Sequence, residues 1–207
     1  MRYKNDKSVE SAINELYQKA IECHNYQVGD LITVSGEQYY VIVDSLKTQD
    51  YVIALKEKPL TVSEVNIYGS SIPVSATNQS GYGGMAFGTV NNYDSFNVKI
   101  VVDNWATAKF TNNQLKNIDN YTARLIKVDE LVDLGFVRSG ALYPINENVP
   151  AWVYKVNYWT MTPSDYGGNR IRVVTNTSRG VDYYPPDFKF SVRPVINVYK
   201  SAITKLN

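Results

Sequence analysis

Few residues of this chain have both the types and the spacing that catalysis requires. Cys23 and His24 are its only cysteine and its only histidine, and such a pair could act as a nucleophile with its base or as two metal ligands. Neighbouring residues point in different directions on a helix, however, and no second cysteine or histidine completes a coordination shell. We therefore predict no metal site and no nucleophile at this pair.

Acidic residues are the second group that could do chemistry. Asp129, Glu130 and Asp133 lie close together in the sequence and could bind a metal ion, but the dipole of a helix that begins nearby accounts for acids in its first turn. The paired carboxylates of a glycosidase have no fixed sequence spacing, so a carboxylate-dependent hydrolase stays open as an alternative. The prediction is that the chain is not an enzyme and has no catalytic residue, metal ion or cofactor.

A third group of residues has the composition of a recognition surface. The loops and turns of segment 164–190 are rich in Tyr, Gly, Asn and Arg, which adaptable binding surfaces use. A tyrosine ring can stack on a sugar or a peptide while its hydroxyl stays in water. The same composition also suits ordinary hairpin loops, which is the alternative interpretation. The candidate ligand-binding residues are Tyr166, Asn169, Arg170, Arg179, Tyr183, Tyr184 and Asp187.

The charges and the hydropathy exclude two classes of partner. The 21 basic and 20 acidic residues give a net charge of +1 and are interspersed, whereas nucleic-acid binding requires a basic surface. No apolar run approaches the roughly 18 to 20 residues of a membrane-spanning helix, so we expect no direct membrane insertion. The polar start at Met1 is unlike a signal peptide, and removal of an upstream leader or membrane anchor is our hypothesis.

These residues must be positioned by an N-terminal helix followed by a larger unit. Apolar residues from Val9 to Ile21 recur with helical spacing and predict an amphipathic helix over 8–23. From residue 28 the period becomes that of strands, and 31–34, 38–43 and 51–55 predict an antiparallel meander. Thr61 and Glu64 have the capping-box spacing of a helix that runs to about Tyr68. We divide the chain into a helical segment, 1–25, and a single domain, 26–207.

The remainder of the chain mixes helices and strands. Segment 69–94 is rich in small polar residues and predicts a long loop. Trp105 belongs to an apolar stripe that predicts a helix over 95–106 with this tryptophan in the core, and Gly135 is placed to end a helix over 128–134. This order of elements predicts an α+β fold. The other expected elements are a helix at 112–118 and strands at 123–127, 152–154, 158–161, 171–176, 181–184 and 191–199.

Three tracts resemble a known family. Residues 123–131 (ARLIKVDEL), 158–163 (YWTMTP) and 192–198 (VRPVINV) resemble a bacterial domain family of unknown function, common in Firmicutes surface and prophage proteins. That family is similar to the C-type-lectin-like fold shared with formylglycine-generating enzymes. Over about 28–200, the resemblance implies twisted antiparallel sheets with two or three flanking helices. It also implies core positions for Trp159 and Arg193, with the arginine packed on Trp159 or Tyr158.

The chain departs from the better-known relatives of that fold. It lacks the Glu-Pro-Asn, Gln-Pro-Asp and Trp-Asn-Asp tripeptides with which calcium-dependent lectins hold a sugar on calcium. Formylglycine-generating activity depends on cysteines in the C-terminal part, and Cys23 lies near the start. Neither calcium-dependent sugar binding nor that enzyme activity is therefore implied for this chain.

The resemblance and the loop composition together give the predicted function. We expect a non-catalytic binding module of a bacterial surface or prophage protein, extracellular or at the cell surface, that recognises a glycan or a protein through the 164–190 loops. A structural or adhesive surface component is the alternative, in which the helix over 8–23 mediates assembly into an oligomer.

Overall fold

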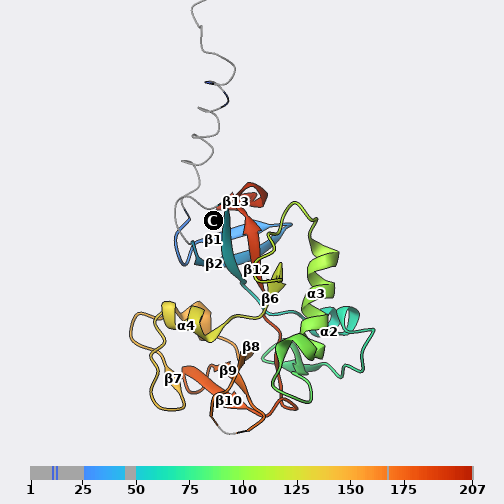
Figure 1. Cartoon of the computed structure of the whole chain (residues 1–207), viewed down its shortest axis with the longest axis vertical. Helices are drawn as coiled ribbons and strands as arrows, with labels where there is room; N and C mark the ends of the chain where they lie inside the picture. Colours follow the sequence, from blue (N-terminus) through green and yellow to red (C-terminus); the bar gives the residue numbers. More distant parts are fainter. Residues whose placement is uncertain (1–10, 12, 14–25, 45–49, 167, 207) are drawn as a thin grey trace, which may run out of the picture.

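The computed structural model describes residues 11, 13, 26–44, 50–166 and 168–206. The predicted helix over 8–23, apart from Ser11 and Ile13, and the Cys23–His24 pair lie outside these residues. The described part has two β-sheets and four α-helices (Figure 1), which confirms the predicted α+β class. No helix in this part is both long enough and apolar enough to cross a bilayer.

The first sheet, sheet A, has six strands in the order β13-β1-β2-β3-β12-β6, and all neighbouring strands are antiparallel. The predicted meander is confirmed as β1–β3. Ser35 and Gly36 both have positive φ, 48° and 77°, as a two-residue hairpin turn requires. The strands are Leu31–Val34 (β1), Glu37–Val43 (β2), Tyr51–Lys56 (β3), Ala123–Arg124 (β6), Val195–Tyr199 (β12) and Lys205–Leu206 (β13).

The second sheet, sheet B, has seven strands in the order β4-β5-β11-β8-β9-β10-β7. Its neighbouring strands are antiparallel except β11 and β8, which are parallel. Figure 1 shows sheet B below sheet A, at the opposite end of the described part from β13. The strands are Thr77–Gln79 (β4), Tyr82–Ala86 (β5), Tyr143–Pro144 (β7), Tyr158–Pro163 (β8), Ile171–Thr175 (β9), Gly180–Tyr184 (β10) and Lys189–Ser191 (β11).

The prediction of a long loop over 69–94 was wrong, because β4 and β5 form a hairpin there. Its glycines have a packing role that composition does not reveal. A Cβ added at Gly83 would lie 2.5 Å from the Thr61 carbonyl oxygen, and one at Gly84 would lie 2.3 Å from Cγ of Gln79. Strand β5 is therefore rich in glycine because other parts of the chain approach it closely.

The helices are Val62–Tyr68 (α2), Asn97–Lys109 (α3), Val128–Asp133 (α4) and Ala151–Tyr154 (α5), with short 3₁₀ turns at Tyr93–Ser95 (η1) and Lys200–Ala202 (η2). The capping box at Thr61 and Glu64 is confirmed, with Glu64 N donating to Thr61 Oγ1 over 3.2 Å. Gly135 follows α4 with a φ of 106°, which confirms its role in ending that helix. Residues 152–154 were predicted as a strand, but they belong to a helical turn, Ala151–Tyr154, after Pro150.

The predicted single strand over 191–199 is in fact two strands in different sheets. β11 belongs to sheet B and β12 to sheet A, so the intervening Val192, Arg193 and Pro194 carry the chain from one sheet to the other. Arg193 is 1 % exposed and donates to the carbonyl oxygens of Lys56, Glu57, Trp152 and Val153 over 2.8 to 3.2 Å. The guanidinium thus joins sheet A to the turn of α5.

Within the described part of the chain, the core consists of two clusters of apolar side chains. Trp105 and Trp159 are fully buried in the larger cluster, to which α3 and strands of both sheets contribute. The indole of Trp159 donates to the Met85 carbonyl over 2.8 Å. The smaller cluster packs α4 and α5 against Val174 and Val195. Both faces of sheet B therefore contact apolar core.

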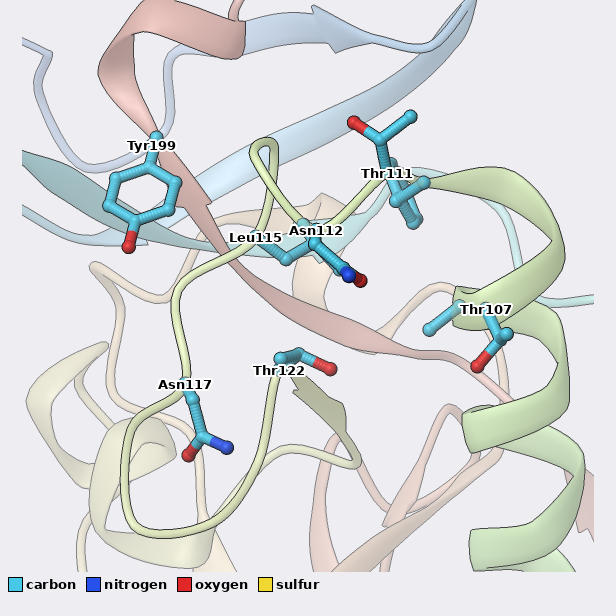
Figure 2. A pocket seen from close by; sticks show the side chains of 9 residues that line it. Thr107, Thr111, Asn112, Leu115, Asn117, Thr122 and Tyr199 are labelled. Atoms are coloured by element: carbon cyan, nitrogen blue, oxygen red, sulfur yellow. The ribbon is translucent and has the colours of Figure 1, made fainter.

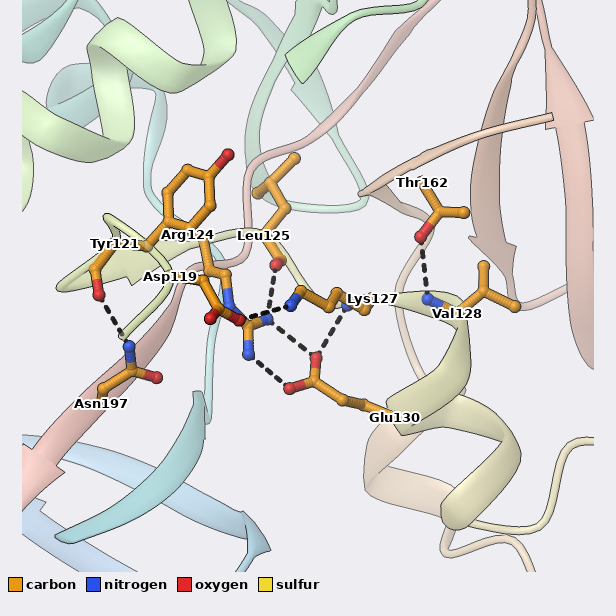
Figure 3. A network of polar contacts seen from close by, with 9 residues as sticks. All are labelled: Asp119, Tyr121, Arg124, Leu125, Lys127, Val128, Glu130, Thr162 and Asn197. Carbon is orange, nitrogen blue, oxygen red and sulfur yellow. Dashed lines mark hydrogen bonds and ion pairs between the residues drawn. The ribbon is translucent and has the colours of Figure 1, made fainter. Parts of the chain in front are cut away.

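A buried ion pair fixes the passage from sheet A to α4. Arg124 on β6 and Glu130 on α4 are 4 % and 7 % exposed, and Nη1 of Arg124 donates to Glu130 Oε2 over 2.8 Å. The same oxygen accepts from Lys127 N, and Val128 N donates to Thr162 Oγ1 of β8 (Figure 3). Glu130 is therefore a structural residue that holds the start of α4 to β6, and the bond from Val128 to Thr162 joins α4 to sheet B.

Candidate functional site

The β8–β9–β10 part of sheet B positions most of the predicted binding residues. Loop 164–170 connects β8 to β9, and β9 pairs with β10 so that Arg172 lies opposite Tyr183. Successive side chains of a strand alternate between its faces, and paired residues share a face. Arg172 and Tyr183 are therefore neighbours on the sheet, directly beside the loop.

Arginines and tyrosines alternate in a continuous stack at this end of the sheet. The guanidinium carbon of Arg172 lies 5.1 Å from the ring centre of Tyr143 and 5.6 Å from that of Tyr183. Arg138 extends the stack beyond Tyr143, with its guanidinium carbon 5.9 Å from that ring centre. Arg170 extends it beyond Tyr183, with its guanidinium carbon 5.0 Å from that ring centre. We call Arg138, Tyr143, Arg172, Tyr183 and Arg170 the arginine–tyrosine ladder. A contact of this kind contributes about 0.5 to 2 kcal/mol, most where water is excluded.

Asp165 fixes two of the three arginines of the ladder. Its two carboxylate oxygens accept from Arg172 and from Arg138, while Arg172 also donates to the Ala141 carbonyl. The hydrogen bond from Arg172 is the main reason that the pKa of Asp165 is lowered. Arg172 is 1 % exposed, and a buried charge requires such partners. The inner part of the ladder is therefore rigid before any ligand binds.

The outer part of the ladder is accessible. The side chain of Arg138 is 61 % exposed, and Tyr166 is 57 % exposed with its ring centre 6.1 Å from that of Tyr183. Three guanidiniums against the one carboxylate of Asp165 leave an excess of positive charge. The surface therefore combines an exposed aromatic ring with cations that have fixed positions.

The seven predicted residues are only partly brought together. Tyr166, Arg170 and Tyr183 share the ladder surface. The side chain of Asn169 donates to the Thr89 carbonyl over 2.7 Å and anchors the loop. Arg179 lies over Tyr154, 5.5 Å from its ring centre, at the other end of the β9–β10 hairpin.

Tyr184 and Asp187 are also separate from the ladder. Tyr184 belongs to the other face of β10, where its ring packs against Phe188 and Phe190, and Asp187 is exposed in the turn after β10. The interpretation of these two residues as half-buried or turn positions fits better than a role in the ladder.

Sequence reasoning missed Arg138, Tyr143, Asp165 and Arg172 as site residues. Arg172 had a signal, because a charged residue inside the apolar strand IRVVT requires a buried partner. Asp165 lay within the tract that was considered but was not selected. Arg138 and Tyr143 had no signal, since only the pairing of β7 with β10 brings them to the site.

The described residues give no positive support to metal chemistry. Among them, no group of three or more His, Cys, Asp or Glu side chains is arranged to hold a metal ion. The buried Glu130 is bonded to Arg124. The carboxylate oxygens of Glu37 lie 3.3 Å from Nζ of Lys56 and 3.0 Å from Nζ of Lys109. Both carboxylates are therefore paired with cationic side chains.

Comparisons of the chain with protein-family models, with curated proteins and with solved structures find no match.

Proposed function

We propose that this chain is a non-catalytic binding module whose ligand contacts the arginine–tyrosine ladder and Tyr166. The observation that carries the proposal is the ladder itself, in which exposed Tyr166 and Arg138 and half-buried Arg170 lie around a buried arginine bonded to Asp165. Preorganised side chains lose little conformational entropy on binding. This order supports recognition, because the exposed Tyr166 and Arg138 lie beside groups that are already held in place.

The charge of the surface favours a ligand that carries negative groups. Guanidinium groups bind carboxylates and phosphates through two parallel hydrogen bonds, and the Tyr166 ring offers a face on which a sugar ring can stack. An acidic glycan presents both features, so it is the ligand that we favour. An acidic protein surface is the alternative, and both belong to the glycan or protein ligands expected from the loop composition.

For the scaffold, we propose a C-type-lectin-like fold in a bacterial surface or prophage protein. Two antiparallel or mixed sheets with flanking helices support this fold. So does the position of the resembling tracts, since 158–163 is a strand of sheet B and 192–198 spans the change of sheet. The surface location rests on the resemblance of these tracts alone.

An array of acidic and neutral glycans with peptidoglycan fragments tests the proposed function. The expected result is retention of acidic glycans by the wild-type chain and at least a tenfold loss with Tyr166→Ala, which removes an exposed aromatic contact. Arg179→Gln is the control for a change outside the ladder, because Arg179 is exposed and lies over Tyr154, which is not part of the ladder. Absence of binding to every glycan would favour a protein ligand instead. Equal loss of glycan retention in both variants would refute the ladder as the site.

A further inference from the structure

A groove separate from the ladder lies between the end of α3 and the loop that leads to β6. Its volume is about 370 Å³, within the range of about 300 to 1,000 Å³ of small-molecule sites. Figure 2 shows Thr107 of α3 and Thr122 of the loop facing each other across this hollow, with Asn117 beside them. Phe110 and Tyr199 add two aromatic rings to the lining.

Most polar side chains that line the groove form no hydrogen bond with the described residues, although Thr111 Oγ1 donates to Gln114 Oε1 over 3.3 Å. Among the described residues, no hydrogen bond is formed by the side chains of Thr107, Asn112, Asn117 or Thr122, and all four are exposed. An amide offers two donors and an acceptor, and a hydroxyl offers one donor and two acceptor sites. The groove thus presents several free donors and acceptors to one small volume.

The walls of the groove are held by hydrogen bonds to β12. Lys116 N donates to the Asn197 carbonyl over 2.8 Å, Asn197 N donates to the Thr122 carbonyl over 3.0 Å, and Tyr199 N donates to Gln114 O over 3.0 Å. Phe110 packs edge-on against the buried Trp105 at 5.4 Å. The loop is therefore fixed on both sides of the hollow, which reduces the entropy cost of binding.

A tight turn orders the tip of the loop. Ile118 and Tyr121 exchange two backbone hydrogen bonds of 2.9 Å, and the residues between them, Asp119 and Asn120, have φ values of 53° and 70°. This geometry is a two-residue hairpin turn, and it places Asn117 and Thr122 opposite one another at the next position. The predicted helix over 112–118 was wrong because this turn and the pairing of Leu115 with Val198 take its place.

The chemistry of the lining restricts the class of ligand. None of the lining residues is charged, so an ionic ligand would lose its hydration without gaining a counter-charge. An apolar ligand would cover the amides and hydroxyls and leave them unpaired. A neutral ligand with many hydroxyl groups and an apolar face for Tyr199 or Phe110 satisfies both conditions.

From this geometry we propose that the groove is a second binding site that takes a neutral saccharide. Asn117 and Thr122 bond to the hydroxyl groups from one wall, and Thr107 bonds from the other. The site is independent of the proposed function, since its residues and its ligand charge differ from those of the ladder.

Titration of the isotope-labelled full chain with neutral tetrasaccharides tests this site by NMR. The probes are chitotetraose, cellotetraose and maltotetraose, each at millimolar concentration, with tetragalacturonate as the charged comparison. At least one neutral probe should shift the amide signals of Thr107, Asn117 and Thr122, and tetragalacturonate should leave them unchanged. Absence of shifts at these three residues with every neutral probe would overturn the proposal.

Two variants test whether the binding uses the groove. Asn117→Ala should weaken the binding about tenfold through loss of its hydrogen bonds, and Thr107→Trp should block the hollow. Asn113→Ala is the matched control, because Asn113 is an exposed asparagine of the same loop that does not line the groove. Equal weakening by Asn113→Ala and Asn117→Ala would contradict the proposal, whereas an unchanged affinity in Tyr166→Ala would separate this site from the ladder.

Discussion

Arg193 lies over the ring of Tyr158 at the place where the chain leaves sheet B and enters sheet A, with its guanidinium carbon 5.1 Å from the ring centre. Burial raises the pKa of Tyr158 to about 12, so its hydroxyl stays neutral and donates to the Val153 carbonyl over 2.8 Å. Arg193 donates to the same carbonyl over 3.2 Å. The two side chains thus fix α5 to the junction of the sheets.

Replacement of Arg193 by alanine should destabilise the fold severely. The variant leaves the buried carbonyl of Lys56 and the partly buried carbonyls of Glu57 and Trp152 without their donor. We expect a loss of about 3 to 5 kcal/mol in the free energy of unfolding. Chemical denaturation measures this loss.

The exposed Arg179 provides the control for Arg193. Arg179→Ala should change the free energy of unfolding by only about 0.5 kcal/mol. A similarly small loss in the free energy of unfolding for Arg193→Ala would contradict a structural role for Arg193. So would a clear fall in ligand affinity with a melting temperature close to that of the wild type.

Glu37 should make stability depend on acid pH. Burial alone would raise its pKa, but the hydrogen bond from Lys109 and the charges of Lys56 and Lys109 outweigh burial and lower it. Because the folded-state pKa is lowered, the stabilisation of the fold by the Glu37 carboxylate is complete above the unfolded-state pKa of about 4.3. It is lost as the pH falls through the lower folded-state pKa.

Denaturation as a function of pH tests this role of Glu37. Glu37→Gln should cost about 1 kcal/mol at neutral pH and should flatten the loss of stability in acid. Glu147→Gln, which changes an exposed carboxylate, should leave the pH profile as in the wild type. An acid profile unaffected by Glu37→Gln would show that other groups carry the effect.

The turn at Asp119 and Asn120 gives a prediction about backbone conformation. Valine is strained at positive φ, so Asn120→Val should cost about 1 to 2 kcal/mol, whereas Asn120→Gly should be tolerated. Thermal unfolding with Asn113→Val as a control measures the difference. Equal melting temperatures for Asn120→Val and Asn120→Gly would be incompatible with the left-handed φ of 70°.

Arg172 should not be replaceable by lysine. The planar guanidinium donates to Asp165 and to the Ala141 carbonyl while it lies between two tyrosine rings, and an ammonium group cannot reproduce this geometry. We expect Arg172→Lys to lower the free energy of unfolding by about 2 kcal/mol. Arg138→Lys, at the exposed end of the ladder, should have little effect, and equal losses in the two variants would refute the distinction between inner and outer arginines.

Local patterns were sufficient to predict much of the fold. The capping box at Thr61, the stripe that buries Trp105 and the stop at Gly135 each depend on residues a few positions apart. The elements that were predicted wrongly depend on contacts between residues far apart in the sequence. Gly83 pairs with Asn78 in a hairpin and leaves room for Thr61, which lies far from it in the sequence. The strand over 191–199 divides because its two ends join different sheets.

The candidate site could be predicted from the sequence only where its residues lie close together along the chain or in a hairpin. Composition identified Tyr166, Arg170 and Tyr183, which are near one another in sequence or in a hairpin. Arg138 is bonded to Asp165, 27 positions later in the chain, and no local pattern indicates such a pair. The groove was missed because its loop reads as a helix unless the Asp119–Asn120 turn is recognised.

Calorimetric titration with tetragalacturonate tests the central claim, that the ladder is a binding surface for acidic ligands, most directly. The measurement compares the dissociation constants of the wild type, Arg170→Gln and Arg179→Gln. The proposed surface predicts about a tenfold weaker affinity for Arg170→Gln and an affinity within about twofold of the wild type for Arg179→Gln. No heat of binding in the wild type, or equal affinities in the two variants, would contradict it.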